Sequence, residues 1–294
     1  MLPSRFAAVC ARQPLLACLA MLLSAASHRF TPELRCLRPT GSHRHISAYA
    51  LQPGMCHIVG AGPGPADLLT VRAARLLQSA KVVVYDDLGA EEALALCPAD
   101  CQRIYVGKRG GSRTSSKQAD IDGLLVQLCQ QGEDVVRLKG GCPSVFSRVA
   151  SEQAALQAAQ VPYTLVPGVS SALAGPLMAG FPLTDKLLSC HFGVVSGHQP
   201  SAVNWAGLRQ LDSLVILMGG AALPDIVKHC LAAGWALETA VCIIHAAATP
   251  SQRIWHSTLD SVMSAVGSEP LSPCIIVVGG AAGIPQALKA GAGG

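Results

Sequence analysis

Short apolar runs with strand character alternate with helical patterns through most of this chain, and this alternation constrains the fold more than any other feature of the sequence. In the first half, helical patterns over 66–80, 118–131 and 151–160 separate strand-like runs at 56–59, 81–85, 134–138 and 163–166. Strands that are apolar throughout and are joined through helices are typical of a parallel sheet covered on both faces. We therefore expect an α/β fold with mostly parallel sheets.

A second series of strands and helices follows the first. Its strand-like runs lie at 192–195, 213–218, 241–244 and 274–278, and its helical patterns lie at 222–233 and 257–266. Pro167 and Gly168 mark the joint between the two series, because proline and glycine interrupt regular structure. We expect two α/β domains, over 55–168 and 169–284, with the active site in the cleft between them, and a disordered tail over 285–294.

The first 50 residues differ in composition from the rest of the chain. They contain six arginines and one acidic residue, Glu33, whereas the following 244 residues carry 16 basic and 17 acidic side chains. Arginine-rich, serine-containing and acid-poor segments are typical of organellar transit peptides, so we expect 1–50 to be a largely disordered transit peptide. The apolar run at 15–26 leaves a secretory signal or a membrane anchor as the alternative. That run is shorter than the roughly 20 residues that a membrane-spanning helix needs.

Charge and cysteine content exclude some functions for the rest of the chain. After residue 50 the formal charge is −1, which gives no broad electrostatic reason to bind a nucleic acid backbone. The chain has 12 cysteines and no CxxC pair, and the spacing of Cys97 and Cys101 matches no zinc or redox signature. We expect most of the cysteines to be small core residues in a reducing compartment.

A glycine-rich loop, Gly60-Ala61-Gly62-Pro63-Gly64-Pro65, follows the first strand-like run. Glycines allow the backbone to approach a ligand closely, and the helix that follows offers free N–H groups. The dinucleotide fingerprint G-x-G-x-x-G is the first hypothesis, but position 65 is proline where that pattern needs glycine. Unless Asp86 takes the role, no acidic residue stands where a ribose would be bound. An NAD-dependent oxidoreductase is therefore disfavoured, and the loop alone indicates either a ligand site or a plain tight turn.

Further motifs follow this loop along the chain. They are VVYDD at 83–87, VGKRGG at 106–111, VVRLKGG at 135–141, PSVFSR at 143–148, VPGVSSALAG at 166–175, GFPLT at 180–184, SGH at 196–198 and LMG at 217–219. Together with GAGPG they closely resemble the uroporphyrinogen-III C-methyltransferases, within the wider group of tetrapyrrole methylases, over residues 55–279. The glycine-rich loop is shared by other methylases of that group, whereas VGKR with Gln118 and VVRLKGG with PSVFSR are much more specific.

The resemblance implies a metal-free enzyme that transfers methyl groups from S-adenosyl-L-methionine to C2 and C7 of uroporphyrinogen III. The product is precorrin-2, for sirohaem or cobalamin, and the family's enzymes are usually homodimers. By position, the implied cofactor contacts are Pro63, Gly140, Gly141, Cys142, Val145, Ser170, Ser171, Met218 and Ala247. Asp86 stands at the position of the proton acceptor and Lys108 at that of the proton donor. The substrate is polyacidic, so the cations of the matched motifs are candidates for binding it: Arg109, Arg137, Lys139 and Arg148.

Several of these assignments have an alternative in local structure. Asp86 adjoins Asp87 after a strand, so either residue can be a helix cap, and Lys108 taken alone is an ordinary surface lysine. Arg137 falls within a predicted strand, where a charge needs a partner, so a structural ion pair is the alternative to substrate binding. Met218 is either a core residue or a cofactor contact.

Four positions depart from the family's pattern, namely Pro65, Cys142, Ser147 and Asp185. The change at 142 matters most, because the family has aspartate there and a thiol is a weak hydrogen-bond acceptor. A paralogue that binds tetrapyrrole or cofactor without turnover is the alternative to an active methyltransferase. Because photosynthetic eukaryotes make sirohaem in plastids, we expect the leader to direct the chain to the plastid, with the mitochondrion as the alternative.

Overall fold

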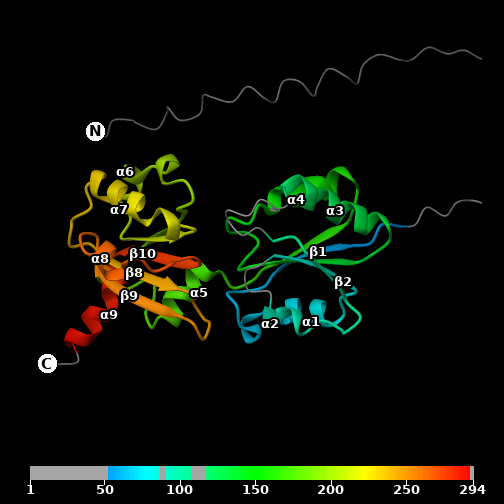
Figure 1. Ribbon diagram of the computed structural model, residues 1–294, viewed down its shortest axis with the longest axis horizontal. Coiled ribbons are helices and arrows are strands. Elements are labelled where there is room, and N and C mark those ends of the chain that lie inside the picture. Colours follow the sequence, from blue (N-terminus) through cyan, green and yellow to red (C-terminus); the bar gives the residue numbers. More distant parts are fainter. Residues whose placement is uncertain (1–51, 87–90, 108–116, 292–294) are drawn as a thin grey trace, which may run out of the picture. The chain divides into compact units, whose positions relative to one another are not determined.

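The computed structural model describes residues 52–86, 91–107 and 117–291, with side chains as far as residue 288. The expected leader, Lys108 and Arg109 lie outside the described residues. Two five-stranded sheets, each with helices on both faces, make up the described part of the chain (Figure 1). No helix in these ranges is long and apolar enough to cross a membrane.

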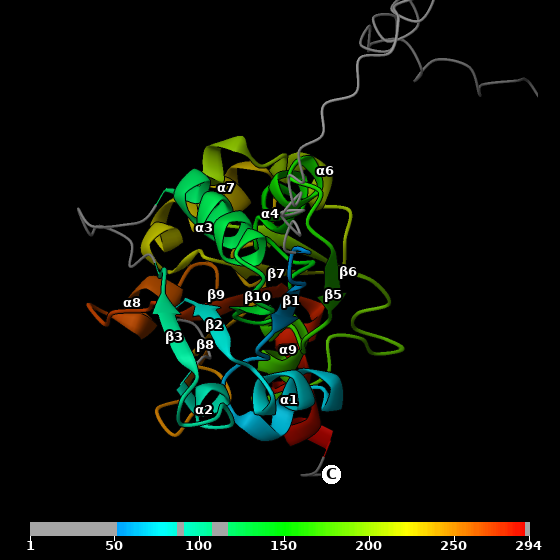
Figure 2. The ribbon, with the colours of Figure 1, turned by 90° about the vertical axis from the view of Figure 1, so that its right-hand side faces the viewer.

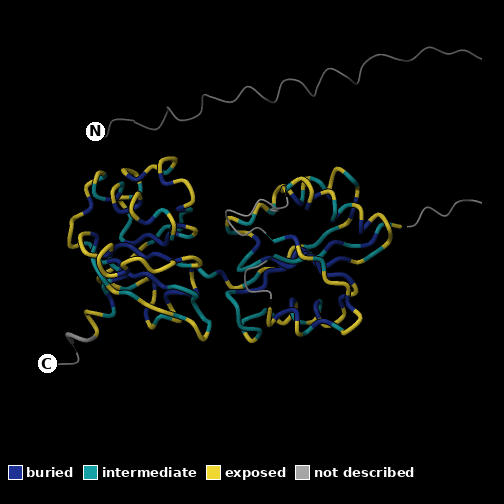
Figure 3. Tube along the Cα trace, in the orientation of Figure 1, coloured by how far each residue is buried: buried dark blue, intermediate teal, exposed yellow. Residues whose placement is uncertain are grey.

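The first sheet is parallel throughout, with the strand order β3-β2-β4-β1-β5. Its strands are β1 (Cys56–Gly60), β2 (Val82–Tyr85), β3 (Gln102–Tyr105), β4 (Val135–Lys139) and β5 (Tyr163–Val166). Its helices are α1 (Val71–Gln78), α2 (Glu91–Leu94), α3 (Gln118–Gln130) and α4 (Val149–Ala158). Figures 1 and 2 show α1 and α2 on one face of the sheet and α3 and α4 on the other. The inner strands β1, β2 and β4 are therefore largely buried on both faces, as their mainly apolar runs predict (Figure 3).

The second sheet is mixed, with the strand order β6-β7-β10-β8-β9. Its strands are β6 (Phe192–Ser196), β7 (Ser213–Leu217), β8 (Ala240–His245), β9 (Arg253–Thr258) and β10 (Cys274–Gly279). Its helices are α5 (Ser171–Met178), α6 (Trp205–Leu208), α7 (Leu223–Ala232), α8 (Val262–Val266) and α9 (Gly280–Gly291). Small residues of α5 and α9, including Ala172 and Ala281, pack on one face, and Trp205, Ile226 and Val262 of the other helices pack on the opposite face.

The expected α/β fold is confirmed, and parallel pairings outnumber antiparallel ones in the described sheets. Only β6 and β7 pair in parallel in the second sheet, whereas β10 is antiparallel to both β7 and β8, and β8 is antiparallel to β9. This difference between the two sheets was not predicted from the sequence. The domain limits at 55–168 and 169–284 stay a prediction.

Three local predictions are corrected by the structure. The tail predicted as disordered over 285–294 is helical as far as Gly291, because Ala282 and Ile284 of α9 are buried against the second sheet. The helix predicted over 66–80 is divided into a 3-10 turn, Ala66–Leu68, and α1, whose N-cap is Thr70. The helix predicted over 257–266 begins only at Val262, since β9 continues to Thr258.

The cysteines behave mainly as core residues. All nine cysteines in the described ranges are free, and six of them are buried. This agrees with the expectation that most are small apolar side chains.

Candidate active site

The loops that follow the parallel strands converge at one edge of the first sheet. β1 and β4 are neighbours, and Gly60 is in register with Lys139, so the loops after these strands leave the sheet side by side. The Gly141 N–H donates to the Gly62 carbonyl over 2.8 Å, and the Gly62 N–H donates to the Gly141 carbonyl over 3.2 Å. Because α/β sheets bind ligands beyond the carboxyl ends of their parallel strands, this edge is the candidate active site.

Glycine is required where these loops touch. A Cβ placed on Gly60 would lie 2.6 Å from the carbonyl oxygen of Gly141 and 2.6 Å from the nitrogen of Gly168. Both neighbours are backbone atoms, so the loops after β1, β4 and β5 are packed backbone against backbone. Gly141 itself has φ +67°, and a Cβ there would have the backbone nitrogen of Ser171 as its nearest neighbour, 4.0 Å away. A side chain at position 141 would thus come into van der Waals contact with the N-terminus of α5, so the loop after β4 lies directly beside that helix.

Most of the predicted cofactor residues lie on these loops. Pro63 is in the loop after β1, and three more residues, Gly140, Gly141 and Cys142, follow β4, with Val145 shortly after them. Ser170 caps α5 by accepting a hydrogen bond from the Ala172 N–H, and Ser171 begins that helix. The first sheet thus brings together seven of the nine predicted contacts, from three segments of the sequence.

The other two predicted cofactor residues follow strands of the second sheet. Met218, after β7, has φ +59° and is 50% exposed, so it is not a core residue. Ala247, after β8, stands between two alanines with positive φ, Ala246 and Ala248. The same loop continues to Thr249, whose Cγ2 would lie 3.5 Å from a Cβ placed on Gly64. The loop after β8 therefore reaches the glycine-rich loop.

Asp86 follows β2 and is held by Arg137 of β4. The Nη2 of Arg137 donates to the Oδ2 of Asp86 over 2.9 Å, and the Gly140 N–H donates to Oδ1 over 3.4 Å. On its other side, Arg137 donates from Nε to the Oε1 of Glu152 over 3.0 Å, and the Nζ of Lys139 donates to the same oxygen over 2.7 Å. The side chain of Asp86 is 29% exposed, whereas Arg137, Lys139 and Glu152 are buried. This network reaches the edge of the site through Asp86.

Arg137 forms the structural ion pair that the sequence left as an alternative to substrate binding. Residues 137 and 139 point to the same face of β4, and α4 covers that face with Glu152. Burial and then the charge of Arg137 lower the pKa of Lys139, while Glu152 and Asp86 oppose this shift. With 3% and 4% of their side chains exposed, neither cation is placed to grip a substrate carboxylate directly.

The other two predicted substrate-binding cations are placed differently. Arg148 is exposed and has a left-handed backbone with φ +61° at the N-cap of α4. Arg109 and the predicted proton donor Lys108 lie outside the described residues, just beyond Gly107 at the carboxyl end of β3. Because β3 is the neighbour of β2, that end of the strand lies beside the one that carries Asp86.

Glu152 is the functional candidate that the sequence analysis missed. Its position is the fourth residue of α4, and its exposed fraction is 0%. A usable signal was present in the sequence. Two basic residues at i and i+2 in a buried strand require a counter-charge from the element that covers that face, and the helix after β4 supplies an acid.

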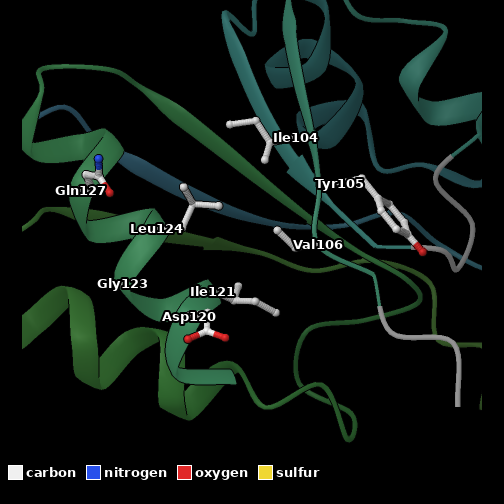
Figure 4. Close-up of a pocket in the computed structure, with 8 residues that line it drawn as sticks. All are labelled: Ile104, Tyr105, Val106, Asp120, Ile121, Gly123, Leu124 and Gln127. Atoms are coloured by element: carbon white, nitrogen blue, oxygen red, sulfur yellow. The ribbon is translucent and has the colours of Figure 1, made fainter. Parts of the chain in front are cut away.

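Two cavities in the described part of the chain are lined by residues other than the predicted site residues. One, of about 560 Å³, lies between β3 and α3 (Figure 4) and is lined by Ile104, Tyr105, Val106, Asp120, Ile121, Gly123, Leu124 and Gln127. Another, of about 370 Å³, is lined by Phe146 and residues of 194–203. Neither contains a predicted site residue, so the candidate site rests on the converging loops. Nowhere in the described ranges do three His, Cys, Asp or Glu side chains gather as a metal site.

Comparison with known proteins identifies the family. The model of the family described as Tetrapyrrole (Corrin/Porphyrin) Methylases matches residues 55–263. The chain belongs to this family. This methylase is 46% identical to a uroporphyrinogen-III C-methyltransferase of Synechococcus elongatus, over 77% of its own length and 93% of that protein's. It is 40% identical to a siroheme synthase of Azotobacter vinelandii, over 77% of its own length and 50% of that protein's.

A solved structure of the same family supports the fold. The uroporphyrin-III C-methyl transferase of Thermus thermophilus, complexed with S-adenosyl homocysteine, has a TM-score of 0.69 with this methylase and 36% sequence identity. The match covers 79% of this chain and 100% of that chain. The expected family and its two-domain fold are confirmed.

Cys142 takes the place of the family's aspartate in this methylase. Its Sγ lies 3.0 Å from the Oγ of Ser144. Burial raises the pKa of the thiol, but hydrogen bonds with Ser144 and with the backbone of Gly168 outweigh burial and lower the pKa overall. These surroundings stabilise a thiolate, which accepts hydrogen bonds more strongly than a thiol. The structure therefore compensates in part for the missing carboxylate.

Proposed function

We propose that this chain transfers methyl groups from S-adenosyl-L-methionine to C2 and C7 of uroporphyrinogen III, giving precorrin-2 for sirohaem synthesis. The observation that carries the proposal is the convergence of three glycine-containing loops beside the ion-paired carboxylate of Asp86. The names of the uroporphyrinogen-III C-methyltransferase and siroheme synthase relatives support the same reaction and pathway.

The residues of the candidate site fit the cofactor. The loop after β4 lies beside the N-terminus of α5, since a Cβ placed on Gly141 would lie 4.0 Å from the Ser171 nitrogen. A helix N-terminus favours a negative group such as a carboxylate. We assign cofactor binding to Pro63 and the residues after β4 and β5, and to Met218 and Ala247 after β7 and β8. When bound, S-adenosyl-L-methionine supplies an electrophilic methyl group.

The chain's own side chains handle the proton and the charges of the substrate. After a carbon of the substrate has gained a methyl group from the sulfonium, the macrocycle carries a positive charge and must lose a proton from another atom, and a fixed carboxylate such as Asp86 is suited to accept that proton. Arg137 holds the carboxylate of Asp86 in a fixed orientation through the 2.9 Å ion pair. We assign proton donation to Lys108. We assign recognition of the substrate's carboxylates to Arg109 and Arg148. Arg137 and Lys139 belong instead to the buried ion pairs next to Asp86.

The test is methylation by the purified full-length chain. Under anaerobic conditions, the chain with S-adenosyl-L-methionine and uroporphyrinogen III should give a product heavier by two methyl groups, measured by mass spectrometry. A parallel reaction with S-adenosyl-L-homocysteine as the only nucleoside should give none. Failure to bind S-adenosyl-L-homocysteine in calorimetric titration would remove the proposal.

A chain that binds without turnover is the second candidate. Cys142 favours it, because a thiol replaces an aspartate beside the predicted cofactor site. The two candidates separate in the same experiment, since a binding-only chain would take up S-adenosyl-L-homocysteine and leave uroporphyrinogen III unmethylated.

We further propose that the protein is a homodimer, in which exposed apolar side chains of residues 165–188 are buried. Seven large hydrophobic residues in this segment are exposed, namely Leu165, Val169, Leu173, Leu177, Met178, Leu187 and Leu188. Leu173 and Leu177 lie on one face of α5, since they are four residues apart. A concentration of exposed apolar surface favours a protein interface.

The dimer is tested by sedimentation. Leu177→Asp should convert a dimer into a monomer, whereas Leu237→Asp, at an exposed leucine outside this segment, should leave the mass unchanged. A monomeric wild-type chain at micromolar concentration contradicts the proposal.

We also propose that residues 1–50 direct the chain to the plastid. The six arginines and single acid of this segment support an organellar leader. A fluorescent fusion of residues 1–50 should enter plastids, and entry into mitochondria would select the alternative compartment.

A further inference from the structure

Asp86 is connected to a buried cluster of charges whose members are Arg137, Lys139 and Glu152. With Asp86 included, this charge cluster has two cations and two carboxylates and therefore no net charge. Glu152 is completely buried, and both cations donate to its Oε1, while its Oε2 has no hydrogen-bond partner among the residues that the structure describes. A buried carboxylate is costly, and buried ion pairs seldom stabilise a fold more than packed apolar residues do. Stability alone therefore does not explain why this buried position holds a glutamate.

Glu152 acts on Asp86 through the guanidinium of Arg137. The Nε of Arg137 faces Glu152, Nη2 faces Asp86, and Nη1 donates to the Leu138 carbonyl over 2.8 Å. A guanidinium is planar and rigid. Fixing it at Nε therefore also fixes the direction of Nη2 and the orientation of the carboxylate that Nη2 binds.

We infer that Glu152 is a positioning residue for the proton removal assigned to Asp86: it orients Arg137 against Asp86 and keeps the charge cluster neutral. The inference rests on the proposed function. Glu152 touches neither substrate nor cofactor in this scheme, and its effect passes entirely through Arg137 and Lys139.

The balance of charges around Asp86 predicts how its basicity changes when Glu152 is replaced. Charged or titratable side chains on the elements beside Asp86, within the described residues, are Cys56 and His57 of β1, Tyr85 of β2, Arg103 and Tyr105 of β3, Arg137 and Lys139 of β4 and Glu152 of α4. A hydrogen bond with Cys129, together with burial, raises the pKa of Cys56, so its thiol stays neutral. Loss of the Glu152 charge thus leaves one uncompensated positive charge beside Asp86. That charge favours the carboxylate and makes Asp86 a weaker base.

The first measurement is the pH profile of kcat for Glu152→Gln. Activity that depends on ionised Asp86 rises with pH through the pKa of Asp86. Since added positive charge lowers that pKa, the acidic limb should move to lower pH by about one unit. The weaker and less fixed base should lower the plateau of kcat roughly tenfold. KM for both substrates should stay unchanged.

Two further variants separate charge balance from structural damage. Lys139→Met gives the cluster a net negative charge and should move the limb to higher pH. The double variant, Glu152→Gln with Lys139→Met, is neutral again and should return the limb to its wild-type position. If Glu152 has only a structural role, the second buried substitution should destabilise the protein further and should not restore the wild-type pH profile.

Asp122→Asn is the matched control. Asp122 is a buried acid of α3 that accepts hydrogen bonds from Gln118 and Ser151. The substitution removes one negative charge from the same helical layer. Within the described residues, no hydrogen bond links Asp122 to Asp86. The acidic limb should not move in this variant.

A direct titration makes the result independent of turnover. The carboxyl carbon of Asp86, followed by NMR in the full-length chain labelled with 13C-aspartate, should titrate at lower pH in Glu152→Gln and at the wild-type pH in the double variant. An unchanged titration in all variants overturns the role of Glu152 even if methylation proceeds. Conversely, a wild-type chain with no methylated product overturns the proposed function, while the titration still decides whether Glu152 controls Asp86. If Glu152→Gln does not fold, Lys139→Met and the double variant carry the comparison.

Discussion

Replacing Gly60 with alanine tests the packing on which the candidate site depends. The new Cβ would lie 2.6 Å from the Gly141 oxygen, 2.6 Å from the Gly168 nitrogen and 2.7 Å from the Gly168 Cα. Overpacking costs about 1–3 kcal/mol, and we expect the upper end, about 3 kcal/mol, because all three neighbours are backbone atoms. For a chain of this size, that loss lowers the melting temperature by roughly 6–12 °C. The displaced loops should also bind S-adenosyl-L-homocysteine about tenfold more weakly, a loss of ~1.4 kcal/mol.

Thermal unfolding and calorimetric titration measure the two effects. The matched control is Gly123→Ala, since a Cβ on Gly123 in α3 meets no atom within 4 Å. That change should stabilise the helix by up to about 1 kcal/mol and leave the affinity unchanged. If Gly60→Ala melted within about 2 °C of wild type, less than 1 kcal/mol for a chain of this size, and bound the ligand equally well, the close packing of the three loops would be refuted.

Three further predictions follow from individual side chains. Asp86→Asn should lower kcat by at least about 100-fold with an unchanged affinity for S-adenosyl-L-homocysteine, and turnover near the wild-type rate would remove Asp86 as the base. The surroundings of Cys142 lower the pKa of its thiol. Iodoacetamide should therefore alkylate Cys142 at lower pH than it alkylates exposed Cys190, as measured by peptide mass spectrometry. Ser144→Ala should raise the pH at which Cys142 is alkylated. Thr70→Ala removes the cap of α1 and should cost about 1 kcal/mol, seen as a melting temperature lower by roughly 2–4 °C; an unchanged melt would mean the cap contributes nothing.

Strand prediction succeeded for the inner strands and for the edge strands β5 and β6, and it failed at the other two edges. The inner strands β2 and β10 read as strands because both faces are covered and their residues are almost all apolar. The edge strands β3 and β9 were missed, since exposed residues such as Gln102 and Arg253 interrupt their apolar pattern. The helix α9 was missed for a different reason. Its glycines and Pro285 suit a loop, and packing of Ala281 and Ala282 against the second sheet overrides that local preference.

The sequence by itself determined four of the five strands of the first sheet, all but the edge strand β3, together with the glycine-containing loops at its carboxyl edge and the family to which the chain belongs. These features are local, because each motif carries its own backbone preference and chemistry. The partners of the charged side chains were decided only by the tertiary structure. Arg137 is separated from Asp86 and Glu152 by 51 and 15 residues, and their contact depends on the register of β2 with β4 and on which face of α4 meets the sheet. The spacing of residues along the sequence determines neither of these. Whether a charged side chain is paired depends on distances of a few ångströms, and these distances are set only when the chain has packed.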